Sequence, residues 1–184
     1  YLLGIFPVFS FRDSDEPYWY CPMNRFVIFP DEIHVSHSMR TLFNKGIYNV
    51  TINKDFRGVI AGCAENRIEM EGAWLGEEMM KAYTELHDLG FASSVEVWRD
   101  DRLVGGLYGV TIGNAFFGES MFSREPGTSK VALISLARYM QKRGGVLIDC
   151  QFETPHLKSL GGRFIKYEEY LRLIRLPRWI SSIQ

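Results

Sequence analysis

Three extended runs joined by two short polar turns occupy the middle of the sequence and constrain its fold more than any other feature. The runs cover residues 94–98, 103–112 and 115–122, and the turns are Asp100-Asp101 and Gly113-Asn114. Strands joined by turns this short pair antiparallel with their neighbours in the chain. The pattern therefore predicts an antiparallel meander of three strands in a glycine-rich setting.

Helical periodicity flanks this meander on both sides. Apolar residues recur at helical spacing over residues 79–87, before Gly90, and over residues 131–140, where Thr128 or Ser129 would cap the helix. Residues 146–151 are too apolar on both faces for an exposed edge strand. The last elements expected are a short helix near residues 156–160, a strand near 163–165 and a helix over 167–176.

The first third of the chain is irregular and punctuated by prolines. It contains strand patterns at residues 25–29 and 48–52, a helix that Ser36 or Ser38 would cap, and a second helix that Asn53 would cap. Hairpin strands followed by strands interleaved with helices predict an α/β (α+β) protein, with a mixed sheet that has helices on both faces. The order of three antiparallel strands, helix, strand and helix resembles the acetyltransferase-like (GNAT) fold.

Composition excludes several classes of protein. Hydrophobic residues make up 46% of the 184 residues, which excludes wholesale disorder, and no apolar run approaches the roughly 20 residues that span a bilayer. The net charge of -1 excludes a generally basic nucleic-acid coat, although not a local basic patch. Three widely spaced cysteines without a CxxC pair favour a reducing compartment, and the four histidines lack metal-ligand spacing. The apolar start of the chain has no basic region and does not read as a signal peptide.

Two acidic positions are candidates for chemistry. Asp149 and Gln151 lie two residues apart in the apolar run 146–151, so a strand there would send both side chains to one face. A carboxylate in such a run is costly unless it is hydrogen-bonded, and a purely structural aspartate is the alternative. Glu119 lies among aromatic residues, with a solvated position on the strand as its alternative.

Two further features are candidates for binding. Free backbone N–H groups at Thr128-Ser129-Lys130, together with the lysine, would suit an anion, although a plain helix cap is the commoner explanation. The aromatic residues at 18–20 and Trp74 could stack on nucleobases, and core packing is an equally good explanation. Neither a P-loop nor a Rossmann fingerprint is present.

Nine ordered segments of the chain resemble one family, the bacterial leucyl/phenylalanyl-tRNA–protein transferases. The segments are Gly4-Ile5-Phe6-Pro7, residues 19–25, Leu86-His87-Asp88-Leu89-Gly90, Ser94-Val95-Glu96-Val97-Trp98, residues 103–109, residues 116–124, Ser129-Lys130, Leu147-Ile148-Asp149-Cys150-Gln151 and residues 155–161. Their order and spacing match the family over essentially the whole chain.

The resemblance implies aminoacyl transfer. The enzyme would move Leu or Phe, and Met less well, from charged tRNA to the α-amine of proteins that begin with Arg or Lys, which marks them for degradation through the N-degron pathway. It would need no cofactor and no metal, because the ester to tRNA is already activated. It would act as a cytoplasmic monomer without a membrane partner. The family's fold is a GNAT-like catalytic domain behind a small N-terminal domain.

The resemblance also assigns residues. The catalytic group is Asp149, which would accept or orient the proton of the attacking amine, with Gln151 fixing Asp149 or binding the ester carbonyl. Glu119 would hold the aminoacyl α-amino group or the basic acceptor residue. Phe116 and Glu119 would point to opposite faces of a regular strand, so we expect a bulge near Gly118. The substrate-binding residues implied are Leu107, Phe116, Leu133, Leu136, Met140 and Ile148 for the Leu or Phe side chain, and Trp19, Trp74 and Tyr83 nearer the adenosine.

Departures from the family pattern lie mainly near the start of the chain. Val8 stands where the family has Trp, Ala73-Trp74-Leu75-Gly76 replaces Thr-Trp-Ile-Thr, and Tyr20 and Cys21 replace Trp and Ser. We expect residues 1–30 to be the remnant of an N-terminal subdomain, with the chain beginning inside it, and residues 31–184 to form the catalytic domain.

Two alternative functions remain open from the sequence. The first is an acyl-CoA N-acyltransferase, weakened because no pyrophosphate-binding loop of the Arg/Gln-x-x-Gly-x-Gly/Ala type precedes Val131. The second is a non-catalytic binder of basic N-termini or tRNA ends. Candidate tRNA phosphate contacts, with an ordinary solvated helix face as the alternative, are Lys130, Arg138, Lys142 and Arg143.

Overall fold

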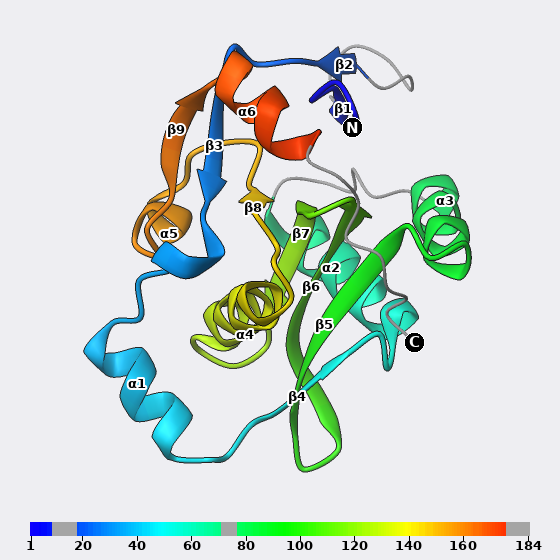
Figure 1. Ribbon diagram of the computed structural model, residues 1–184. Helices are drawn as coiled ribbons and strands as arrows, with labels where there is room; N and C mark the ends of the chain where they lie inside the picture. The colour runs from blue at the N-terminus through cyan, green and yellow to red at the C-terminus, as the bar shows by residue number, and fades with distance from the viewer. Residues whose placement is uncertain (9–17, 71–76, 176–184) are drawn as a thin grey trace.

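A seven-stranded mixed sheet forms the centre of the molecule (Figure 1). The computed structural model describes residues 1–8, 18–70 and 77–175. The strand order is β4-β5-β6-β7-β8-β3-β9, and a separate hairpin pairs β1 with β2. The strands are β1 (Phe6–Val8), β2 (Tyr18–Tyr20), β3 (Asn24–Ile28), β4 (Asn49–Ile52), β5 (Ala92–Arg99), β6 (Arg102–Ile112), β7 (Ala115–Ser123), β8 (Leu147–Asp149) and β9 (Arg163–Lys166).

Helices lie on both faces of this sheet, as Figure 1 shows. They are the 3-10 helix η1 (Pro30–Glu32), α1 (His37–Asn44), α2 (Phe56–Met70), α3 (Glu77–Asp88), α4 (Thr128–Lys142), α5 (Pro155–Lys158) and α6 (Tyr167–Ile174). Alternation along β6 sends Leu107 into the core with α4 and Tyr108 into the core with α2. The predicted class, a mixed and largely antiparallel sheet flanked by helices, is confirmed.

The predicted meander is also confirmed, since β5, β6 and β7 pair antiparallel in sequence order. The β5–β6 hairpin closes through Asp100 and Asp101, whose φ angles are 49° and 62°. Two consecutive left-handed residues give the turn that matches strand twist, and aspartate tolerates this conformation better than most side chains do. The β7–β8 pair is the one parallel pairing in the seven-stranded sheet.

Two predicted helix caps are wrong and one is confirmed. Ser36 caps α1 by accepting from the N–H of Met39. The N-cap of α4 is Gly127, with φ 85°, because the Thr128 hydroxyl instead donates to the carbonyls of Val104 and Glu125. The side chain of Asp55 caps α2 by accepting from the N–H of Gly58. Asn53 does not cap this helix, because its side-chain oxygen accepts from the N–H of Ser94.

Two observations bear on the ends of the predicted elements. The predicted strand 146–151 lies inside the sheet as expected, but β8 ends at Asp149. Strand β3, which belongs to the expected subdomain of residues 1–30, lies between β8 and β9 in the main sheet. The division at residue 30 stays a prediction. Among the helices that the structure describes, none is long and apolar enough to cross a bilayer.

Candidate active site

A cavity of about 480 Å³ opens where β7 and β8 separate. Their pairing ends at Phe117 and Asp149, whereas β7 continues to Ser123. Beyond Asp149 the chain turns away, and the N–H of Cys150 donates to the carbonyl of Phe26 on β3. Strand ends that diverge in this way leave room for a ligand between them.

One end of this cavity is apolar. It is lined by Leu107, Phe116, Leu133 and Ile148, each at most 3% exposed. These are four of the six residues predicted for the Leu or Phe side chain. The other two, Leu136 and Met140, line a separate cavity of about 20 Å³ that Phe116 also borders.

A β-bulge brings Glu119 to the cavity. Tyr108 pairs with Ser120 and Gly109 with Gly118, which leaves Glu119 without a cross-strand partner. The bulge expected near Gly118 is therefore confirmed. The extra residue changes the facing of the side chains beyond it, so Glu119 and Phe116 both line the cavity although a regular strand would send them to opposite faces.

Two tyrosines hold the carboxylate of Glu119. The Tyr1 hydroxyl donates to Oε1 at 2.5 Å, and the hydroxyls of Tyr1 and Tyr83 are 3.0 Å apart. Burial raises the pKa of Glu119, while the hydrogen bonds from both tyrosines oppose that rise. Tyr83, predicted to bind substrate, thus contacts the acid rather than lining the cavity.

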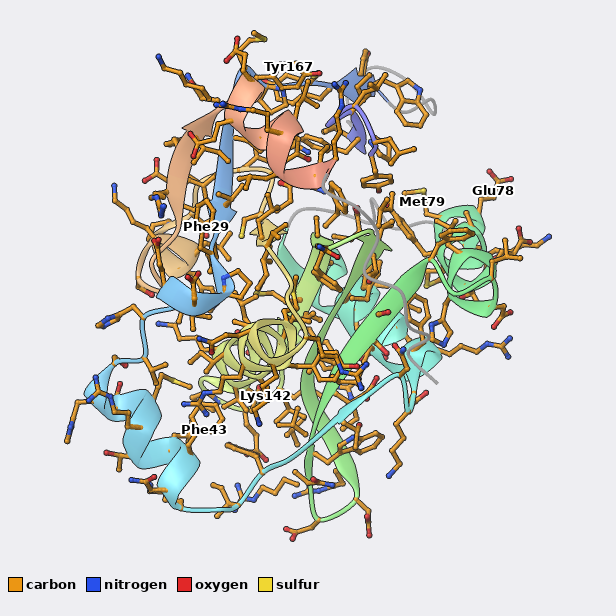
Figure 2. All side chains as sticks on the ribbon, viewed as in Figure 1. Phe29, Phe43, Glu78, Met79, Lys142 and Tyr167 are labelled. Atoms are coloured by element: carbon orange, nitrogen blue, oxygen red, sulfur yellow. The ribbon has the colours of Figure 1, made fainter. Side chains whose placement is uncertain are left out.

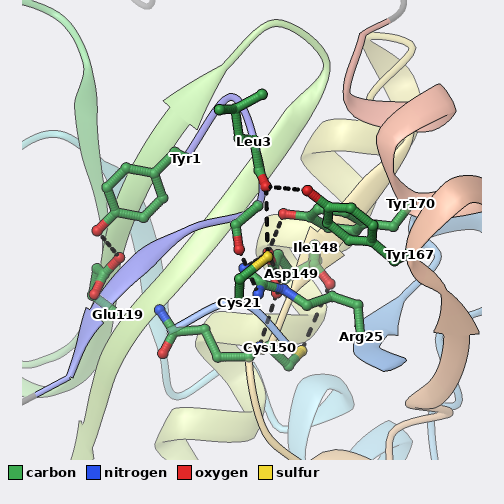
Figure 3. Close-up of polar contacts among 12 residues, drawn as sticks. Tyr1, Leu3, Cys21, Arg25, Glu119, Ile148, Asp149, Cys150, Tyr167 and Tyr170 are labelled. Atoms are coloured by element: carbon green, nitrogen blue, oxygen red, sulfur yellow. Dashed lines mark hydrogen bonds and ion pairs between the residues drawn. The ribbon is translucent and has the colours of Figure 1, made fainter. Parts of the chain in front are cut away.

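Asp149 forms a buried ion pair with Arg25 (Figure 3). The Nη2 atom of Arg25 donates to Oδ2 at 2.7 Å, and the Tyr170 hydroxyl donates to the same oxygen at 2.7 Å. Arg25 is 1% exposed and Asp149 is fully buried. The predicted hydrogen-bonded aspartate is present, and its partners come from β3 and α6.

Gln151 reaches the cavity by a different route from the one predicted. Because β8 ends at Asp149, Gln151 is not on the strand, and the expectation of a shared strand face is wrong. Its φ is 62°, and its backbone N–H donates to Asp149 Oδ1 at 2.9 Å. The Nε2 atom is buried and no acceptor in the described part of the chain meets hydrogen-bond geometry with it, although the Gln151 side chain lies near enough to Glu119 to oppose the rise in the pKa of that acid.

Aromatic side chains gather at the mouth of the cavity. Phe152 lines it and stacks on Tyr20, with 5.7 Å between ring centroids. Tyr20 and Trp19 on β2 are 47% and 69% exposed, so core packing does not explain them. Trp19 itself does not line the cavity, and Trp74 lies outside the described residues.

Sequence reasoning missed Arg25, Tyr170 and Phe152 as functional candidates. A signal existed for Arg25, because this arginine precedes the apolar run Phe26-Val27-Ile28 as Asp149 follows Leu147-Ile148. Two opposite charges in two apolar strands suggest a buried pair.

Of the predicted basic residues, Lys130 donates to the Ser159 hydroxyl at 3.2 Å, and Lys142 ends α4 (Figure 2). Among the side chains that the structure describes, in residues 1–8, 18–65 and 77–175, no cluster of three or more His, Cys, Asp or Glu residues is suited to a metal.

Solved structures resemble the chain only distantly. A conserved protein of unknown function from Bacteroides thetaiotaomicron VPI-5482 matches with a TM-score of 0.53 and 11% identity, over 74% of this chain and 53% of that one. A ribosomal-protein-alanine N-acetyltransferase from Brucella melitensis biovar Abortus 2308 matches with a TM-score of 0.42 and 13% identity, over 74% of this chain and 97% of that one.

Sequence relatives are much closer. A leucyl/phenylalanyl-tRNA–protein transferase from Syntrophus aciditrophicus (strain SB) is 52% identical over 95% of this chain and 73% of its own length. One from Chromohalobacter salexigens is 51% identical over 99% of this chain and 70% of its own length. Residues 27–175 match the model of the family described as leucyl/phenylalanyl-tRNA protein transferase. The chain belongs to the leucyl/phenylalanyl-tRNA protein transferase family.

Proposed function

We propose that this protein transfers a leucyl or phenylalanyl group from charged tRNA to the N-terminal α-amine of an acceptor protein that begins with Arg or Lys. The observation that carries the proposal is the cavity between β7 and β8, which joins an apolar end to a buried carboxylate. An apolar side chain and a cationic amine are the two features of an aminoacyl group that such a cavity would recognise.

The reaction needs an amine, an ester and no external energy source. The uncharged acceptor amine attacks the ester carbonyl and forms a tetrahedral intermediate. That attack forms the new C–N bond; collapse of the intermediate then breaks the ester C–O bond, and the proton lost by the amine goes to the ribose oxygen that leaves. Positioning the two reactants in one cavity supplies much of the acceleration for such a step.

The apolar end sets donor preference. Leu107, Leu133 and Ile148 exclude polar side chains because they offer no hydrogen bonds to replace those lost with water. Such a pocket separates Leu from Met by only about 1–3 kcal/mol, so it accepts Met less well rather than rejecting it.

The polar end is assigned three roles. Glu119 accepts a hydrogen bond from an ammonium group, either that of the aminoacyl donor or that of the basic acceptor residue. Gln151 offers its unpartnered Nε2 to the ester carbonyl oxygen. Asp149 orients rather than accepts a proton, because its oxygens already receive hydrogen bonds from Arg25, Tyr170 and the Gln151 backbone.

The proposal also covers the role of the reaction in the cell. Addition of Leu or Phe would mark acceptors for degradation through the N-degron pathway, in the cytoplasm, by a monomer without cofactor or metal. Tyr20, which stacks on the cavity-lining Phe152, and Trp19, its neighbour on β2, are exposed aromatics that suit the end of a nucleic acid chain because every nucleobase offers a face for stacking.

The direct test is transfer of labelled Leu or Phe from charged tRNA to a protein with N-terminal Arg or Lys. We expect Gln151→Ala to reduce transfer and Gln141→Ala, on the exposed end of α4, to leave it unchanged. The same acceptor with a blocked N-terminus should remain unlabelled. Acetyl transfer from acetyl-CoA in the absence of aminoacyl transfer would instead identify an acyl-CoA N-acyltransferase, and tight binding of charged tRNA without turnover would identify a non-catalytic binder.

A further inference from the structure

The guanidinium of Arg25 is held on every side, although it does not line the cavity. Its Nε lies 2.9 Å from both oxygens of Asp149, Nη2 lies 2.7 Å from Oδ2, and Nη1 donates to the carbonyl of Gly4 at 2.8 Å. The rings of Phe6 and Tyr170 lie 4.4 Å and 4.9 Å from its central carbon. Three segments distant in sequence, at residues 4–6, 149 and 170, thus converge on this one side chain.

Stability alone is a weak explanation for this arrangement. Removing an arginine and an aspartate from water costs much of what their attraction returns, so buried ion pairs are often no more stabilising than apolar packing. What a planar, bidentate pair does provide is a fixed orientation of the carboxylate. The position of the pair beside the cavity points to what that orientation serves.

The carboxylate passes its orientation on to Gln151. While Arg25 and Tyr170 hold Oδ2, Oδ1 accepts the backbone N–H of Gln151 at 2.9 Å. Gln151 has a φ of 62°, a left-handed conformation that residues other than Gly, Asn and Asp rarely adopt. Backbone strain of this kind persists where surrounding contacts impose it, and it concentrates at functional sites.

The result is an amide left unsatisfied inside the cavity. Gln151 Nε2 is buried with no acceptor in hydrogen-bond geometry among the described residues, and the side chain lies close enough to Glu119 to oppose the rise in the pKa of that acid. A buried donor without a partner is costly unless a ligand completes it.

We propose that Arg25 and Tyr170 are positioning residues, which fix Asp149 and through it hold Gln151 in the conformation that presents its side-chain amide to the substrate. This inference rests on the proposed function for its catalytic consequence. Beyond that function, we infer that Arg25 on β3 and Tyr170 on α6 set the orientation of the Gln151 amide without touching the substrate themselves.

Two variants perturb the network in different ways. Arg25→Lys keeps the charge and loses the planar fork, and Tyr170→Phe removes one hydroxyl from Asp149. Tyr167→Phe is the matched control, because Tyr167 lies on the same helix, α6, as Tyr170. Its hydroxyl donates to the Leu3 carbonyl at 2.8 Å and does not contact Asp149. Tyr170→Phe keeps the experiment informative if Arg25→Lys fails to fold.

The first measurement is a double-mutant cycle on transfer. Each network variant should lower kcat on the order of tenfold, with KM for charged tRNA changed less than about twofold, because positioning acts on the reacting geometry. In a Gln151→Ala background the same variants should lower kcat by less than about twofold, since their effect passes through that side chain. Equal losses in both backgrounds, or full activity in folded Arg25→Lys, would overturn the proposal.

The second measurement does not depend on activity. The side-chain amide resonances of Gln151, identified by their loss in Gln151→Ala, should shift or broaden in Arg25→Lys and Tyr170→Phe and stay in place in Tyr167→Phe. An unperturbed amide in both network variants would refute the positioning role, even if Gln151→Ala turned over too slowly for the cycle. If the wild-type protein transferred nothing, the proposed function would fail while these resonances still decided the structural claim.

Discussion

Glu119→Gln should make the protein more stable and less active, and these opposite effects have one cause. Burial raises the pKa of Glu119 above its ordinary value of 4.5, so between that value and the raised pKa the folded protein holds a proton that the unfolded chain has released. As the pH rises from about that ordinary value through the raised pKa, the native state loses stability because the buried carboxylate ionises. Glutamine has the same shape and no charge, so the free energy of unfolding should rise at neutral pH.

The loss of activity follows from the hydrogen bonds at the carboxylate. Oε1 already accepts from Tyr1, so an ammonium group from substrate binds beside an occupied oxygen and depends on the negative charge. A hydrogen bond to a charged group contributes about 1.5–3 kcal/mol, which corresponds to a roughly 10- to 150-fold loss in kcat/KM.

The assay combines urea unfolding at pH 5 and pH 7.5 with transfer of labelled Leu. The stability gain of Glu119→Gln over wild type should be larger at pH 7.5. The matched control is Glu125→Gln, because hydrogen bonding to Tyr48 lowers the pKa of Glu125, so that variant should lose stability at neutral pH and keep activity. A Glu119→Gln protein that is less stable than wild type at pH 7.5, or that transfers at the wild-type rate, would refute the reasoning.

Three further predictions test other parts of the site. Phe116→Ala should join the two cavities that this ring separates and shift donor preference from Leu toward larger side chains, measured by competition between charged tRNAs. Gly109→Ala should lower the melting temperature and transfer together, because a Cβ there would clash with the Phe117 carbonyl oxygen and meet the Phe116 ring at 2.7 Å. Affinity for charged tRNA should fall as salt rises, with a log–log slope that becomes shallower when basic residues of α4 and its C-cap are neutralised; equal slopes would exclude them as phosphate contacts. Those residues are Lys130, Arg138, Lys142 and Arg143.

Local sequence patterns predicted the sheet well, because a short turn and the alternation of apolar and polar residues each depend on only a few neighbouring residues. The meander and the apolar interior of β8 depend on such nearest-neighbour chemistry. The cap of α4 was mispredicted because Thr128 bonds to Val104, a partner 24 residues away that no local pattern reveals. Caps compete with tertiary contacts of similar strength, so sequence cannot decide between them.

The site was predictable in its residue types and not in its arrangement. Six residues were predicted for the apolar end of the site, and four of the six line the cavity. Leu136 and Met140 were placed with them by the family resemblance, yet they line a separate cavity that Phe116 also borders. The partners of Asp149 were missed because Arg25 is 124 residues away in sequence and meets it only across the β3–β8 pairing.

One irregularity in β7 accounts for both ends of the cavity. A regular β7 would continue its parallel pairing with β8, and the space between them would be filled by a ladder of hydrogen bonds. The extra residue at Glu119 increases local twist and bends the strand just past Phe117, where the pairing with β8 stops. The same residue turns its carboxylate toward Tyr1 and Tyr83. One bulge thus lies where the pairing with β8 stops and also supplies the acid that lines the cavity, so the apolar residue Phe116 and the acid Glu119 come from the same strand.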